Sequence, residues 1–132
     1  MNFRALQILC ICAVAATWMA CGAGHPTITH LTVAPAMAQA PVSPPTDVQF
    51  TVTATFTNNN NRELTAVDGL TWASANTSIA TISDNGSATC LAVGPAAITA
   101  TAPTDLNLTV NNGINNTSPK ITATAQLNCT AM

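Results

Sequence analysis

Few side chains in this sequence have the chemistry of catalytic or metal-binding groups. Two histidines, His25 and His30, are metal-ligand types, but nothing nearby completes a ligand set with them. The acidic residues are scattered along the sequence, and their spacing indicates no pair of carboxylates for acid–base catalysis. Asp84 precedes Asn85-Gly86 and is expected to form a turn rather than bind calcium. No serine lies in a nucleophile-elbow pattern. We therefore predict a protein that is not an enzyme, with no metal site and no cofactor.

Three of the five cysteines lie in the first 21 residues, which have the pattern of an export signal. One basic side chain, Arg4, precedes an apolar run from Ala5 to Ala20. Sixteen residues at a helical rise reach about 24 Å, which is short of a hydrocarbon core of roughly 30 Å. We therefore interpret residues 1–20 as a signal peptide rather than a permanent transmembrane helix.

Cys21 stands directly after the small residue Ala20, at the end of the signal. The segment Trp18-Met19-Ala20-Cys21 resembles a bacterial lipoprotein lipobox. The resemblance implies that Cys21 becomes the first mature residue and carries acyl chains that anchor the protein in a membrane. Gly22 follows, not Asp, which favours the outer membrane. Residues 21–27 are then a short tether. The alternative is ordinary cleavage nearby, which leaves a secreted protein.

The composition after the signal favours β structure and argues against nucleic-acid binding. Only 6% of the whole chain is charged, and Thr, Ala and Asn are abundant. Beyond residue 21, two basic side chains stand against five acidic ones, a net charge of −3. This segment therefore has no basic patch that nucleic acids would require. Disorder is the alternative for a chain rich in Thr, Asn and Pro, but the apolar alternation argues against it.

Alternation of apolar and polar residues, with turn residues between the runs, predicts short strands and no helix. The clearest run is 48–56, where every second residue is apolar and the residues between are Gln and Thr. Ile28 is out of phase with Leu31 and Val33, which indicates a bulge or a later strand start. The seven strands are expected at residues 28–33, 48–56, 70–72, 79–82, 87–93, 96–102 and 120–130.

The segments between these strands carry turn and loop residues. Four prolines between residues 35 and 45 restrict that segment to a sheet edge or a loop, because proline cannot donate to a ladder. Asn58–Asp68 and Thr104–Ser118 are expected to be loops, the second an unusually long one. Binding residues concentrate on such loops, so a binding site is expected there.

The middle of the chain resembles a known family. Leu70-Thr71-Trp72-Ala73-Ser74, Ile79-Ala80-Thr81-Ile82 and Ile98-Thr99-Ala100-Thr101 occur in this order, with glycines between the last two runs. This pattern is similar to the bacterial Ig-like domain, group 2. The resemblance implies an all-β fold, an immunoglobulin-like β-sandwich of about seven strands, formed as one domain by residues 28–132. The positions that carry the resemblance are Trp72, Ser74, Ala80, Ile82, Gly86, Gly94 and Ile98.

Cys90 and Cys129 are the cysteines that remain if Cys21 is acylated and the signal is removed. Both lie on the apolar phase of their predicted strands, and export allows disulfides to form. We predict that they are joined. The alternative is two buried free thiols that pack as small apolar groups.

The family resemblance implies a cell-surface module for adhesion or binding, with a protein or polysaccharide as partner. The lipid anchor would make the membrane a second partner, and the cell envelope the location. Two alternatives remain open. One is a structural subunit of an envelope assembly that has no ligand of its own. The other is a secreted module that binds a small molecule or inhibits an enzyme, which would require an unlipidated N-terminus.

Overall fold

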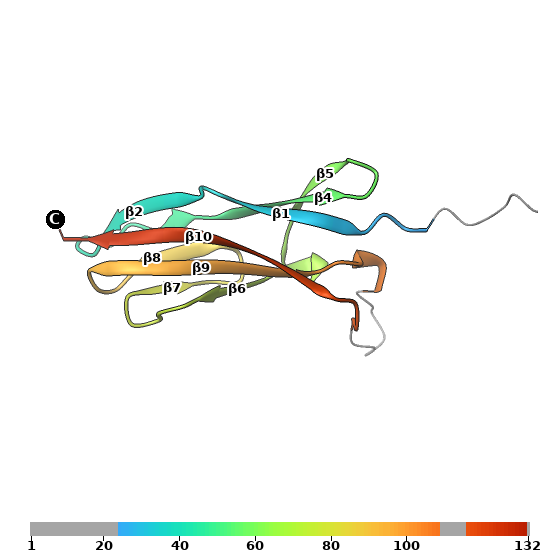
Figure 1. The fold of residues 1–132 in the computed structure, drawn as a ribbon. Helices are drawn as coiled ribbons and strands as arrows, with labels where there is room; N and C mark the ends of the chain where they lie inside the picture. The colour runs from blue at the N-terminus through green and yellow to red at the C-terminus, as the bar shows by residue number, and fades with distance from the viewer. Residues whose placement is uncertain (1–23, 109–115, 132) are drawn as a thin grey trace, which may run out of the picture.

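The computed structural model describes residues 24–108 and 116–131, which form two layers of antiparallel and parallel strands (Figure 1). Ten strands and two short 3-10 helices, η2 (Ala66–Asp68) and η3 (Leu106–Leu108), make up the described part. The predicted all-β fold is therefore confirmed. The predicted signal peptide, Cys21 and residues 109–115 of the second predicted loop lie outside the described residues.

The first layer consists of two three-stranded sheets, and one continuous stretch of chain contributes a strand to each of them. One sheet has the order β1 (Ile28–Ala34), β4 (Thr51–Phe56), β5 (Asn61–Leu64). The other has the order β3 (Val48–Gln49), β8 (Ser87–Cys90), β7 (Ala80–Ile82). Phe50 separates β3 from β4, so the predicted strand 48–56 is one run that changes sheets partway.

The second layer is a four-stranded sheet with the order β2 (Met37–Pro41), β10 (Lys120–Thr130), β9 (Gly94–Pro103), β6 (Thr71–Ser74). β9 and β10 pair antiparallel over ten residues, from Lys120 opposite Pro103 to Cys129 opposite Gly94. β2 joins the free edge of β10 in parallel. The chain from Ile28 to Pro41 therefore serves both layers, because β1 pairs with β4 and β2 pairs with β10.

The seven predicted runs all contain strands, and the three additional strands have specific causes. The proline-containing segment lies at a sheet edge as β2, which the prolines allow because its outer side needs no donors. Phe50 divides one run into two. β5 lies in a segment that we predicted as loop, so that prediction is wrong over 61–64. The predicted irregularity at Ile28 is confirmed as a register shift between Ile28 and His30.

The core lies between the layers and is made mostly of small side chains. Val52, Ala54, Ile98, Ala100 and Leu127 are fully buried. Phe50, at 1% exposed, is the largest fully buried side chain. Such a core buries little area per residue, so a covalent cross-link makes a large relative contribution to stability.

Candidate functional site

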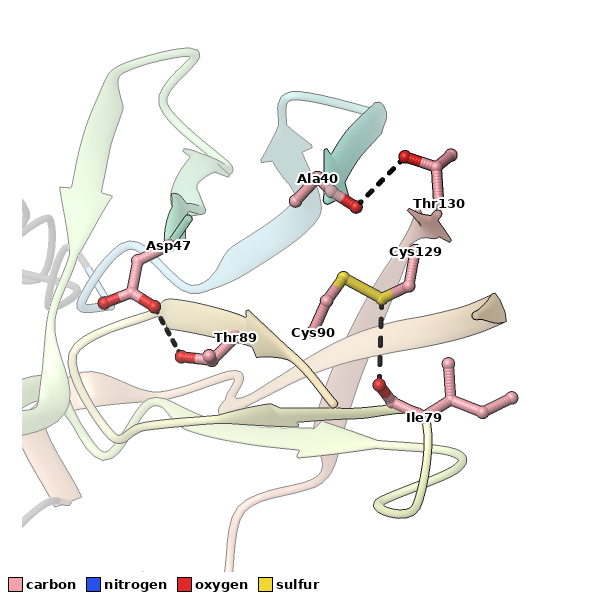
Figure 2. Close-up of a disulfide and its surroundings, with 7 residues drawn as sticks. All are labelled: Ala40, Asp47, Ile79, Thr89, Cys90, Cys129 and Thr130. Carbon is pink, nitrogen blue, oxygen red and sulfur yellow. Dashed lines mark hydrogen bonds between the residues drawn. A yellow bond between two sulfur atoms is a disulfide. The ribbon is translucent and has the colours of Figure 1, made fainter. Parts of the chain in front are cut away.

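Cys90 and Cys129 are joined by a disulfide in the structure, as predicted (Figure 2). Cys90 ends β8 in the first layer, and Cys129 lies near the end of β10 in the second. Their Cα atoms are 5.6 Å apart, within the range of roughly 4.4–6.8 Å that disulfides need. Both residues are buried, at 2% and 3% exposed. The bond therefore links the two layers, which no ladder hydrogen bond can do.

Two hydrogen bonds hold the strands around the disulfide (Figure 2). The Thr130 hydroxyl donates to the Ala40 carbonyl at 3.5 Å, across the β2–β10 edge. The Thr89 hydroxyl donates to Asp47 at 2.5 Å and fixes the chain that enters β3. The Cys129 sulfur lies 3.7 Å from the Ile79 carbonyl oxygen, as a contact only, because a disulfide sulfur has no proton to donate. We call this region the disulfide end.

Trp72 and Gly86 are two of the positions that carry the family resemblance. Both lie beside Phe50, where the chain passes from β3 to β4. The Trp72 and Phe50 rings are 6.4 Å apart at an interplanar angle of 49°. Gly86 has φ +83°, and a Cβ there would lie 2.3 Å from the Phe50 carbonyl oxygen and 3.3 Å from the Trp72 ring. Only glycine fits this place, since both the backbone conformation and the space exclude a side chain. These two positions therefore serve the fold.

The other positions that carry the resemblance are also structural. Ala80 and Ile98 are completely buried, and Ile82 packs partly buried against the same core. The Ser74 hydroxyl accepts a hydrogen bond from the Asn76 amide at 3.3 Å, at the turn after β6. At Gly94, φ is +146°, and a Cβ would lie 2.9 Å from the Ile79 Cδ1 atom. The residues that identify the family thus do not together form a binding surface.

The two predicted binding loops meet at the opposite end of the sandwich, beside the described N-terminus (Figure 1). An open groove of about 500 Å³ lies between them. We call it the asparagine groove. Phe56 lines it together with Asn58, Asn60, Asn61, Arg62 and Asn107.

The first of these loops is largely ordered by a single carboxylate, Asp68. It accepts from Arg62 Nη2 at 2.7 Å and from the Thr65 amide at 3.0 Å, which caps η2. Gly69, with φ +81°, ends the 3-10 helix in the left-handed conformation. The segment 58–68 is therefore a compact unit that contains β5 and η2, rather than the loop we predicted.

The second loop is closed at its base. The Thr104 amide donates to the Pro119 carbonyl at 2.8 Å, and the Ile28 amide donates to the Thr104 carbonyl at 2.8 Å. Asn116 Nδ2 donates to the Asp105 carbonyl at 2.9 Å. The bases of both predicted loops are thus held by hydrogen bonds of side chains and backbone.

A second hollow, of about 240 Å³, lies beside Trp72. We call it the Trp72 hollow. Its floor is formed by Phe50, Leu64 and Leu70, which are buried, and its rim includes Val67, which is 86% exposed. Sequence reasoning did not find this hollow. The nearest sequence signal is the isolated apolar Val67 within a polar segment, and such a residue is common on surfaces.

The titratable residues that the structure describes do not gather into a metal site. His25 and His30 are both exposed. Across residues 24–108 and 116–131, no group of three or more His, Cys, Asp or Glu is placed to hold an ion. No helix in this part of the chain is long and apolar enough to cross a membrane.

Comparison with known proteins identifies the fold family. The family model for the bacterial Ig-like domain (group 2) matches residues 28–111, which begin with β1 and include η3. No match to the chain is found among the curated proteins. Domains of this family are non-catalytic and occur in surface and extracellular proteins of bacteria, which is consistent with a binding or adhesion module. Because the matched residues make up more than half of the chain, the protein belongs to the bacterial Ig-like domain family, group 2.

Proposed function

We propose that this protein is an exported, non-enzymatic binding module of the bacterial cell envelope, anchored by a lipid on Cys21. The observation that carries the proposal is the buried disulfide between Cys90 and Cys129. Disulfides of this kind persist in oxidising compartments and are rare in the cytosol. Export through the signal at residues 1–20 accounts for that compartment.

The anchor would set the orientation of the sandwich. The described chain begins at Gly24, beside the asparagine groove, and the disulfide end lies at the far end of both layers (Figure 1). With only a few residues between Cys21 and β1, the asparagine groove faces the membrane and the disulfide end faces away from it. The partner, a protein or polysaccharide, then approaches from the sides or from the disulfide end.

Metabolic labelling with an alkyne fatty acid tests the anchor. We expect the full chain to be labelled and to fractionate with the outer membrane of a two-membraned host, and Cys21→Ser to lose both properties. Mass spectrometry of the mature N-terminus gives the independent measurement. An unmodified Cys21, or a mature chain that begins beyond it, would overturn the anchor and favour the secreted alternative.

Cross-linking in intact cells separates a binding module from a structural subunit. We expect the anchored protein to capture a partner that dissociates from it after purification. Recovery only as a fixed member of an envelope complex would instead support the structural alternative.

A further inference from the structure

The Trp72 hollow is assembled from three regions of the chain that are distant in sequence. The first region is Gln49 to Thr51, where the chain passes from β3 to β4. The second runs from β5 through η2 into β6 and contributes residues 63–67, Leu70 and Trp72. The third is Asp84 and Asn85, in the turn before β8. Its volume of about 240 Å³ is below the range of roughly 300–1,000 Å³ typical of small-molecule sites. The hollow therefore suits a single side chain of a partner better than an oligosaccharide.

Hydrogen bonds hold the walls of the hollow in place. Gln49 Nε2 donates to the Asn85 carbonyl at 2.7 Å and to the Phe50 carbonyl at 3.0 Å. The Ser83 hydroxyl donates to Asn85 Oδ1. On the other side, the Thr65 amide is bound by Asp68 at 3.0 Å. The shape is thus present before any partner binds, which lowers the cost of binding.

The charges at the hollow are all of one sign. Glu63 and Asp84 line it, and within the described residues neither carboxylate forms an ion pair or a hydrogen bond. The neighbouring cation, Arg62, is already paired with Asp68 at 2.7 Å. A neutral partner that covered the hollow would remove two carboxylates from water without compensation, which is costly. A partner group with a positive charge supplies that compensation.

We propose that the Trp72 hollow binds an arginine or lysine side chain of a protein partner. The aliphatic stem would lie against Val67 and the half-buried Trp72, where the indole ring also attracts a cation. The charged group would lie near Glu63 and Asp84. The inference rests on the proposed function, since it specifies that the partner of the module is a protein with an exposed basic residue.

Trp72 provides the readout for the test. The chain has two tryptophans, and Trp18 lies in the signal, so the processed protein retains Trp72 alone. The exported protein, purified in detergent, is titrated with the peptide acetyl-Gly-Arg-Gly-amide while the tryptophan fluorescence is recorded. The matched probe is the same peptide with citrulline, which has the shape of arginine without its charge.

We expect a saturable change in Trp72 fluorescence with the arginine peptide, and binding about tenfold weaker with the citrulline peptide. Added salt should weaken the arginine response. Equal responses to both peptides, or a response only to added oligosaccharide, would overturn the proposal.

Charge-matched variants locate the site. The variant Glu63→Gln/Asp84→Asn should lose about tenfold in arginine-peptide binding. Asp47→Asn/Asp105→Asn removes the same charge away from the hollow and should bind as the original protein does, since each Asn keeps its acceptor oxygen. Thermal unfolding checks that both variants fold. If the Glu63→Gln/Asp84→Asn variant captures an envelope partner as well as the original protein does, this inference fails while the proposed function stands.

Discussion

The two ends of the sandwich are held together by different kinds of bond. At the disulfide end, Cys90–Cys129 joins the layers covalently within a buried site. At the end with the asparagine groove, the connections are hydrogen bonds and one ion pair, made largely by Asn, Asp, Ser and Thr on exposed segments. The first end therefore resists separation of the layers, and the second consists of local loops that each satisfy their own polar groups.

The comparison shows which connections are weakest around this small core. Strands within one layer are joined by ladder bonds, but apart from the disulfide and the hydrogen bond between Ile28 and Thr104 the described layers meet mainly through side-chain packing. Because alanine fills much of the interface, that packing contributes less per residue than larger side chains would. The disulfide lies where β8 of one layer and β10 of the other come together. It therefore strengthens the connection between the layers, which is the weakest one.

Removing the disulfide should have the largest effect. The bridge closes a loop of 39 residues in sequence, for which the chain-entropy estimate is about 4 kcal/mol. Cys90→Ala/Cys129→Ala should lower the free energy of unfolding by about that amount, measured by urea denaturation. A loss below about 1 kcal/mol would mean that the ends do not differ in the way described.

Gly86→Ala tests the region between the ends. The substituted residue would need φ +83° and a Cβ 2.3 Å from the Phe50 carbonyl oxygen. We expect a loss of about 3 kcal/mol in unfolding free energy. Gly24→Ala is the matched control, because nothing lies within 4 Å of a Cβ there. An equal effect of the two substitutions would contradict the role assigned to Gly86.

Asp68→Asn probes the hydrogen-bonded end. The substitution removes the ion pair with Arg62 and weakens the cap on Thr65, so we expect a loss of about 1 kcal/mol. Asp84→Asn changes the same charge at a carboxylate that has no partner among the described residues and should alter stability by less than about 0.5 kcal/mol. If Asp68→Asn caused as large a loss as removal of the disulfide, the two ends would not differ in the way described.

Hydrogen exchange should reveal the smallest difference. The Asn59 amide donates to Phe56 at one end, and the Leu91 amide donates to Ile79 at the disulfide end. We expect the Asn59 amide to exchange faster in the native protein, because exposed turns open locally without global unfolding. After reduction of the disulfide, the Leu91 amide should lose protection and the Asn59 amide should change little. The opposite response would contradict this prediction, because it would show that the disulfide stabilises the end with the asparagine groove.

Local patterns in the sequence were sufficient for the seven predicted runs and for the inward phase of both paired cysteines. Residues 120–130 alternate so regularly that their burial follows directly, and Cys129 falls on the inward phase with Leu127 and Ala125. β5 was missed because Asn61, Arg62 and Glu63 have little strand preference, and only Leu64 is buried. That strand forms because β4 offers an edge to pair with.

The amino-acid sequence by itself determined the β class, the family, the inward phase of both cysteines and the candidate export signal, because each depends on residue type and short-range spacing. Only the tertiary structure decided that Phe50 divides one run between two sheets, that β2 pairs in parallel with β10, and that three distant regions of the chain enclose the Trp72 hollow. The physical reason is that these features depend on contacts between residues far apart in sequence. Local alternation records which side of a strand is apolar, but it does not record which strand lies beside it.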